Sequence, residues 1–173
     1  VQRILKMVDS VLLLVDAFEG PMPQTRYVLK NALQQGLNPI VVINKIDRPN
    51  ARPDDVLNAV FDLFVDLEAS EDQLDFPVLY ASAKEGFARY DTNDGNQDLI
   101  PLFETIISHV KEPEGDAGSP LQIFTSAISY DNYLGKIGTG KIHNGVIKQN
   151  DTVMKIKRDG EQELFKVTRL FTY

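Results

Sequence analysis

The sequence has no cysteine, no tryptophan and only two histidines among its 173 residues. Without cysteine the chain can form no disulfide, offers no thiol nucleophile and cannot build a zinc site of the usual kind. No apolar run approaches the roughly 20 residues that span a membrane, and no signal peptide opens the sequence. These absences predict a cytoplasmic protein with no membrane partner and no metal site formed by these residues.

Positive charge is also scarce, since 18 lysine and arginine residues stand against 25 acidic residues, for a formal net charge of −7. The charge is unevenly spread: residues 1–112 carry −8, residues 113–119 carry −2, and residues 120–173 carry +3. A chain this acidic is a poor general binder of polyanions. DNA is therefore not an expected partner. Any contact with RNA is expected in the last third, where an ordinary solvated surface explains the +3 equally well.

A short apolar run at residues 39–43 ends abruptly in the polar residues Asn44, Lys45 and Asp47. Such a β-branched run is typical of a buried parallel strand, and open α/β sheets bind ligands at the carboxyl ends of their strands. A carboxylate there can accept two parallel hydrogen bonds from the N1 and N2 groups of guanine, an edge that adenine lacks. The lysine stem can lie over a base with its ammonium in water, and the asparagine amide can tie neighbouring loops together. The alternative interpretation is an ordinary polar turn.

A second apolar run, at residues 76–81, ends in the small polar turn Ser82, Ala83 and Lys84. Small residues let the backbone approach a ligand closely, and the N–H of Ala83 can donate a hydrogen bond to a purine O6. Two consecutive strands therefore end in complementary parts of one expected base pocket.

These two clusters resemble the guanine-recognition motifs of the GTPase superfamily. Residues 16–25 resemble the translational GTPases, and residues 44–53 and 73–77 are similar to the BipA (TypA) branch of ribosome-associated GTPases. The resemblance extends over essentially all 173 residues. It implies GTP or GDP as the ligand, the ribosome, with its rRNA and proteins, as the partner, and a guanine site formed by Asn44, Lys45, Asp47, Ser82, Ala83 and Lys84.

The resemblance further implies that the intact protein hydrolyses GTP on the ribosome, in translation, ribosome assembly or stress adaptation. Another translational GTPase, such as LepA or a G-type elongation factor, is an alternative within the class. A non-hydrolysing module that binds the ribosome or RNA is the alternative outside it.

The apolar pattern of residues 1–112 predicts an α/β fold, a GTPase-like sheet with flanking helices that lacks its N-terminal part. Strands are expected at residues 10–15, 39–43 and 76–81, and helices at residues 25–35, 53–69 and 98–110, with another helix at the start of the chain. We expect an acidic, solvated connection at residues 70–76 and a polar surface loop at residues 85–97.

Residues 113–119 lie in a stretch dense in proline, glycine and charge, and are expected to be a linker. Beyond it, residues 120–173 predict short strands at 121–129, 135–144, 151–157 and 162–170, which is typical of a small β-barrel. The glycines around Lys141 resemble the second domain of translational GTPases, and Asn150 replaces a glycine of that family at a turn. The resemblance implies rRNA contacts by Lys136, Lys141 and Lys148, although solubilising lysines explain them equally well.

A phosphate-binding loop of the form Gly-x-x-x-x-Gly-Lys-Ser/Thr does not occur in the sequence. The resemblance implies that this loop and the Mg²⁺ ligands of the intact protein lie upstream, so no residue of this chain is expected to be catalytic. The chain is therefore expected to be the second half of a G domain followed by most of a barrel, to bind nucleotide weakly alone, and to self-associate through exposed sheet edges at residues 12–15 and 41–43.

Overall fold

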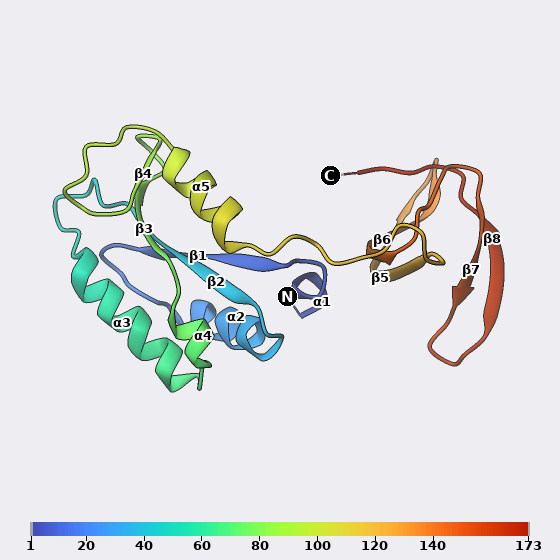
Figure 1. Cartoon of the computed structure of the whole chain (residues 1–173), viewed down its shortest axis with the longest axis horizontal. Coiled ribbons are helices and arrows are strands. Elements are labelled where there is room, and N and C mark those ends of the chain that lie inside the picture. Colours follow the sequence, from blue (N-terminus) through green and yellow to red (C-terminus); the bar gives the residue numbers. More distant parts are fainter. Residues whose placement is uncertain (1, 173) are drawn as a thin grey trace. The chain divides into compact units, whose positions relative to one another are not determined.

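The structure is a computed structural model that describes residues 2–172, so Val1 and Tyr173, the outermost residues of the two expected domains, lie outside it. The chain divides into two compact units, a first unit up to Pro113 and a second unit from Glu114 onward (Figure 1). Over the described residues, no helix is both long enough and apolar enough to cross a membrane.

The first unit is an α/β layer structure with one four-stranded sheet in the order β1-β2-β3-β4. Strands β1, β2 and β3 run parallel, and β4 pairs with β3 in the antiparallel direction. In chain order its elements are α1 (Gln2–Leu5), β1 (Ser10–Asp16), α2 (Pro23–Gln34), β2 (Asn38–Asn44), α3 (Pro53–Asp66), α4 (Glu71–Leu74), β3 (Val78–Ser82), β4 (Phe87–Arg89) and α5 (Ile100–His109).

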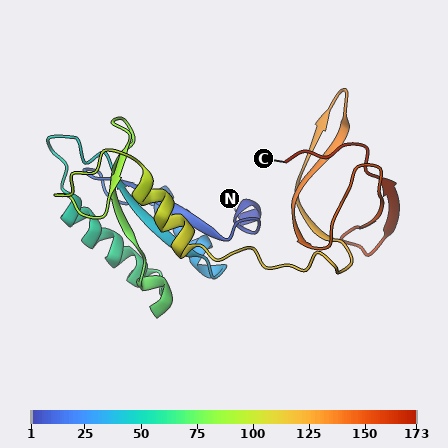
Figure 2. The same cartoon turned by 45° about the horizontal axis from the view of Figure 1, so that its top comes forward.

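Helices cover both faces of this sheet (Figures 1 and 2). On one face, Val41 and Ile43 of β2 pack with Phe64 of α3 and with residues of α2, in a cluster that excludes water. On the other face, Val42 of β2 and Leu79 of β3 pack against α5. The central strands are therefore apolar on both sides, which explains why their sequences show no alternation.

Strands β1, β2 and β3 and helices α2, α3 and α5 confirm the expected elements, with ends that differ by at most three residues. The first helix is the exception. Helix α1 ends after one turn, at Leu5, and Val8 packs beyond it against the cluster of Leu5, Ala32 and Leu37.

Two segments expected to be irregular contain regular structure. Residues 70–76 hold α4, whose start is fixed because Gln73 N donates to Ser70 Oγ (3.3 Å) and Ser70 N donates to Gln73 Oε1 (3.1 Å). Gln73 is buried, and its Nε2 donates to the carbonyls of Leu33 (3.1 Å) and Leu37 (3.0 Å) at the end of α2. The expectation of a wholly solvated connection was wrong, because one amide of this acidic segment anchors a neighbouring helix.

The polar segment 85–97 contains β4, whose Phe87 and Ala88 are buried against the sheet.

Sheet order also corrects the expectation for the exposed edges. Strand β1 lies at one edge of the sheet, with Leu12 and Leu14 exposed, whereas β2 has β1 and β3 as neighbours. Residues 41–43 therefore offer no edge for self-association.

The second unit consists of strands and connections over its described residues. Strands β5 (Gln122–Asp131) and β6 (Gly135–Asn144) form one antiparallel hairpin, and β7 (Thr152–Ile156) and β8 (Gln162–Lys166) form another. Glycine is required at position 145, where φ is +74° and a Cβ would lie 2.6 Å from Leu121 backbone atoms. Asn150, with φ +74°, confirms the left-handed turn that was expected there. Among residues 114–172, Val167 is the one buried hydrophobic side chain.

Candidate functional site

The first unit brings the two predicted clusters together at one edge of the sheet. Asn44 is the last residue of β2 and Ser82 the last residue of β3, and the parallel pairing places Asn44 opposite Ala81. Asp16, the last residue of β1, lies opposite Asn44 on the other side. Three neighbouring strands therefore end side by side, and their polar side chains share one surface.

The Asn44 side chain joins the loops that follow β2 and β3. Its Oδ1 accepts hydrogen bonds from the backbone N–H of Lys45 (2.8 Å) and from that of Ala83 (3.0 Å). Its backbone carbonyl accepts from Ala17 N (2.8 Å), just after β1. The expectation that this amide ties neighbouring loops together is confirmed. The Ala83 N–H, which was expected to face a purine, is engaged by Asn44 in this structure.

Lys45 has an unusual backbone and an ion-paired side chain. Its φ is +69°, in the left-handed region that residues with a side chain seldom adopt. Its Nζ lies 2.6 Å from Asp16 Oδ2, and Arg48 Nη1 lies 3.6 Å from the same oxygen. The hydrogen bond from Lys45, followed by that from Phe18 N–H, lowers the pKa of Asp16 to about 2. This carboxylate is therefore ionised at any physiological pH.

Asp47 lies at the exposed rim of the site. The pKa of Asp47 is below its ordinary value, chiefly because the buried Ser82 side chain hydrogen-bonds to it. Partial desolvation opposes this effect, whereas the charges of Lys84 and Arg48 add to it. The result is an ionised carboxylate held by a rigid neighbour, with the ability to accept further hydrogen bonds.

A cavity of about 230 Å³ lies between these groups, lined by Asn44, Lys45, Asp47, Arg48, Ala83 and Lys84. Five of the six residues predicted to bind guanine line it, and Ser82 lies buried beneath it. Pockets for drug-sized ligands measure about 300–1,000 Å³, so this cavity suits a single base and not a whole nucleotide.

Asp16 and Arg48 also belong to this site, although neither was predicted as a site residue from the sequence. A signal for Asp16 was present, because it closes the first apolar strand in the same way that Asn44 and Ser82 close the next two. Its long-range pairing with Lys45, 29 residues away, is visible only in the fold.

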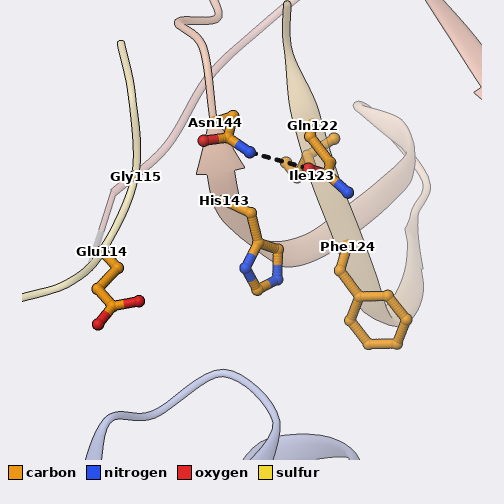
Figure 3. Close-up of a pocket in the computed structure, with 7 residues that line it drawn as sticks. All are labelled: Glu114, Gly115, Gln122, Ile123, Phe124, His143 and Asn144. Carbon is orange, nitrogen blue, oxygen red and sulfur yellow. Dashed lines mark hydrogen bonds between the residues drawn. The ribbon is translucent and has the colours of Figure 1, made fainter. Parts of the chain in front are cut away.

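A larger cavity, of about 540 Å³, lies in the second unit, where Figure 3 shows Phe124 and His143 on the same side of the hairpin. Two of the side-chain amides that line it have structural partners. Asn144 Nδ2 donates to Gln122 Oε1 (3.0 Å), and Asn144 Oδ1 accepts from Asp116 N (3.0 Å). These bonds fix the segment before β5 onto the hairpin, so the cavity marks a structural joint.

The structure does not bring the three predicted RNA-contacting lysines onto one face. Lys136 and Lys141 both lie in β6, five positions apart, and side chains at odd spacings point to opposite faces of a strand. Lys148 lies in the following connection, where its N–H donates to Asp151 Oδ2 (2.7 Å). A single basic patch is therefore not formed by these residues.

Over the residues that the structure describes, no group of three histidine, cysteine or acidic side chains could hold a metal ion. Asp16 does not fit a Mg²⁺ ligand, because the Lys45 ammonium lies 2.6 Å from one of its carboxylate oxygens and would repel a cation.

Comparison with known proteins gives a consistent picture. The family model for the elongation factor Tu GTP-binding domain matches residues 1–112. The chain is 52% identical over 173 residues to the large ribosomal subunit assembly factor BipA of Salmonella typhimurium, and 50% identical to that of Bacillus subtilis. The BipA protein of Haemophilus influenzae is 55% identical over 161 residues, or 93% of the chain. The chain spans 28% of the length of the first two relatives and 26% of the third.

Solved structures show the same fold. Translation elongation factor SelB from Methanococcus maripaludis matches 88% of the chain in its apo form, with a TM-score of 0.63 and 23% identity. Its complex with the GTP analogue GppNHp matches 93% of the chain, with a TM-score of 0.65. The chain covers 31% of the apo SelB chain and 33% of the SelB chain in the complex.

Proposed function

The chain belongs to the family of the elongation factor Tu GTP-binding domain, and from this membership we propose that it forms the guanine-recognising part of a ribosome-associated GTPase. One observation carries the proposal. Residues from two motifs, 35 or more positions apart in sequence, line one base-sized cavity at the carboxyl ends of β2 and β3.

The proposed reading of the base depends on Asp47. Guanine presents N1–H and the 2-amino group side by side, and an ionised carboxylate can accept both hydrogen bonds. Adenine has an acceptor at N1 and no 2-amino group, so it would leave this carboxylate unsatisfied. The hydrogen bond from Ser82 keeps Asp47 ionised, so that the carboxylate would accept both hydrogen bonds of guanine. Such a contact would discriminate guanine from adenine.

Ala83 and Lys45 have supporting parts in the proposal. The Ala83 N–H would share its hydrogen bond between Asn44 Oδ1 and the purine O6, as in common three-centre bonds. The stem of Lys45 would cover one face of the base. Lys84, at the rim, would add positive charge near a nucleotide.

GTP hydrolysis and ribosome binding are proposed for the complete protein, in line with the relatives named as assembly factors of the large ribosomal subunit. This chain would contribute the base pocket, since its glycine-rich segment Gly135–Lys141 lies within strand β6 and pairs with β5, unlike a phosphate loop that opens a helix. A protein that works on ribosomes would act in the cytoplasm, with GTP or GDP as its ligand and Mg²⁺ bound by residues outside this chain.

We further propose that the two hairpins of the second unit belong to a translation-factor barrel, with residues 113–119 as the linker. The match to SelB supports this arrangement, because it covers 93% of the chain and therefore extends well beyond the first unit. The lysines Lys136, Lys141 and Lys148 would then contact rRNA separately, since they share no single face.

Competition for labelled GDP on the complete protein tests the base pocket, with guanosine and xanthosine diphosphates as competitors. Xanthine carries a carbonyl where guanine carries its 2-amino group, so Asp47→Asn should prefer xanthosine diphosphate. Asp75→Asn, an exposed carboxylate outside the cavity, is the matched control and should keep the guanosine preference. An unchanged preference in Asp47→Asn would contradict the role of Asp47, and absence of GDP binding by the wild type would refute the proposed function itself.

A further inference from the structure

From the sequence we expected the Lys45 ammonium group to lie in water. In the structure it is paired with a carboxylate. It lies 2.6 Å from Asp16 Oδ2, which belongs to the neighbouring strand β1 and not to either guanine motif. The two partners differ in exposure: the Asp16 side chain is 16% exposed and that of Lys45 is 45% exposed. The carboxylate is therefore the fixed member of the pair, and the lysine is the member that it restrains.

The Asp16 carboxylate is held in place by its own loop. Its Oδ1 accepts hydrogen bonds from the N–H groups of Phe18 (2.9 Å) and Glu19 (3.3 Å). Its carbonyl accepts from Gly20 N (3.0 Å), which closes the turn. Because one carboxylate oxygen is committed to this turn, the other is presented toward Lys45 in a fixed direction.

A neighbouring loop fastens this turn from outside. The Arg52 N–H donates to the Ala17 carbonyl (2.8 Å), and Arg52 Nε donates to the Phe18 carbonyl (3.1 Å). The guanidinium of Arg52 also lies over the Phe18 ring, 5.7 Å from its centroid. Arg52, at the far end of the loop that follows β2, therefore holds in place the turn that carries the Asp16 carboxylate.

The consequence for Lys45 is a stem fixed at both ends. Its backbone is held by the Asn44 Oδ1 bond to Lys45 N, and its ammonium is held by Asp16. The four methylene groups between them run along the cavity that Lys45 lines. A free lysine side chain loses up to about 2 kcal/mol of conformational entropy when it is ordered. A stem already ordered in the free protein avoids most of that loss when a base packs on it.

We propose that Asp16 is a positioning residue of the guanine site, which fixes the Lys45 stem as the wall against which the base stacks. The inference rests on the proposed function, because it assigns Asp16 to the same pocket. Asp16 does not itself touch the base. It acts through Lys45, the nearer of its two cationic partners, and base selection remains with Asp47.

An effect of Asp16 through its charge alone would change nucleotide affinity in the opposite direction. The direction of the measured change therefore distinguishes the two roles. Lys45, Arg48 and Lys84 all line the cavity, and the Asp16 carboxylate lies within ion-pair distance of the first two. If Asp16 acted only through its charge, its removal would strengthen the binding of an anionic nucleotide. If Asp16 positions the stem, its removal weakens binding.

The experiment measures GDP affinity and dissociation rate on the complete protein for Asp16→Asn, Lys45→Met and the double variant. Asparagine keeps the oxygen that accepts from Phe18 and Glu19 but loses the charge, and methionine keeps an unbranched stem but loses the ammonium. Each single variant should weaken GDP binding about fivefold, as expected for a partly exposed ion pair, and mainly by faster dissociation. The double variant should be no weaker than the weaker single variant, because both changes remove the same tether.

Glu19→Gln is the matched control, since it removes one negative charge from the same exposed loop without breaking the pair. It should leave GDP binding unchanged. Asp16→Asn should also keep the preference for guanosine over xanthosine diphosphate, because Asp47 is untouched.

Tighter binding by Asp16→Asn, or losses that simply add in the double variant, would overturn the positioning role. If Asp16→Asn lowers the melting temperature, Lys45→Met tests the same tether from its exposed end, and unchanged GDP binding in that variant would equally overturn it. A wild type without guanosine preference would instead refute the proposed function, so the two failures are distinguishable.

Discussion

The two units of this chain bury their apolar residues very differently. Of the hydrophobic side chains buried in the described structure, all but Val167 lie in the first unit. In the second unit, large apolar side chains such as Ile128, Tyr130 and Ile156 are 68–72% exposed. Both units have ordered strands, so the difference does not lie in secondary structure but in what covers it.

The reason lies in how the strands are connected. In the first unit each crossover between parallel strands carries a helix, and the helices cover both sheet faces. In the described part of the second unit the connections between strands carry no helix, and the two hairpins form separate two-stranded sheets. Isolated hairpins are marginally stable in water. The candidate site therefore lies on the unit that has a buried core of its own, whereas the second unit leaves most of its apolar side chains exposed.

The largest expected difference concerns matched phenylalanines. Phe64 is fully buried and lies 4.4 Å from the Phe76 ring, whereas Phe165 in β8 is 44% exposed. Phe64→Ala should cost about 3–5 kcal/mol of the free energy of unfolding of the first unit. Phe165→Ala should cost under about 1 kcal/mol, because it leaves no cavity. Urea unfolding followed by circular dichroism measures both. Equal losses of unfolding free energy in the two variants would contradict the difference in burial between the two units.

Glutamine provides a second pair, in which the same amide-to-carbonyl bond is buried in one unit and exposed in the other. Gln73 donates to two carbonyls and is buried, whereas Gln149 donates to the Thr168 carbonyl (2.9 Å) at the surface. Gln73→Ala should destabilise by about 2 kcal/mol, because buried acceptors are left unpaired. Gln149→Ala should cost under about 0.5 kcal/mol, since water replaces the lost donor. Thermal unfolding distinguishes these outcomes, and a larger cost for Gln149→Ala would contradict the prediction.

Acid should affect the first unit through Asp16. The pKa of this carboxyl is lowered from 3.8 to about 2 in the folded state, so its contribution to stability is present above pH 3.8 and is lost as the pH falls toward 2. After allowance for solvent screening of the exposed lysine, the contribution is about 1 kcal/mol. Between pH 5 and pH 2.5 the wild type should lose more stability than Asp16→Asn, by most of this amount, because the other carboxyl groups with lowered pKa titrate in both proteins. An equal loss in both would show that Asp16 does not titrate as its contacts imply.

The smallest expected effect concerns two exposed ion pairs, one in each unit. They show whether exposure or the unit in which a pair lies determines its energy. Lys157 pairs with Glu161 (2.6 Å) in the second unit, and Arg26 pairs with Asp66 (3.2 Å) in the first, with all four side chains 41–66% exposed. Lys157→Gln and Arg26→Gln should each change stability by under about 0.5 kcal/mol. Chemical denaturation at low and high salt checks this. A cost confined to one unit would show that something other than exposure sets the energies.

Local patterns were enough to predict most elements from the sequence. The run before Asn44 and the glycines that bound strand β6 are signals contained within ten residues, and both were interpreted correctly. Strand β4 was missed because three residues within a polar segment carry too little periodicity. The anchoring of α2 by Gln73 spans 36 and 40 positions, and no local pattern distinguishes that glutamine from its exposed neighbours.

The candidate site shows the same division. Its motifs follow from residue types at fixed spacing, and the fold brings five of the six predicted residues to one cavity. The tether from Asp16 to Lys45 could not be predicted, because it depends on the order of strands in the sheet. By contrast, the separation of Lys136 from Lys141 follows from the period of the strand that the sequence predicted at residues 135–144.

The left-handed backbone of Lys45 has a consequence for selection. A side chain at φ +69° costs about 1 kcal/mol relative to glycine, which adopts this conformation freely. Glycine at position 45 would relieve this backbone strain, but it could neither pair with Asp16 nor cover a base. The backbone conformation and the proposed contact with a base therefore favour different residues at this position. A trade-off between the two is thus concentrated in a single backbone angle at the end of β2.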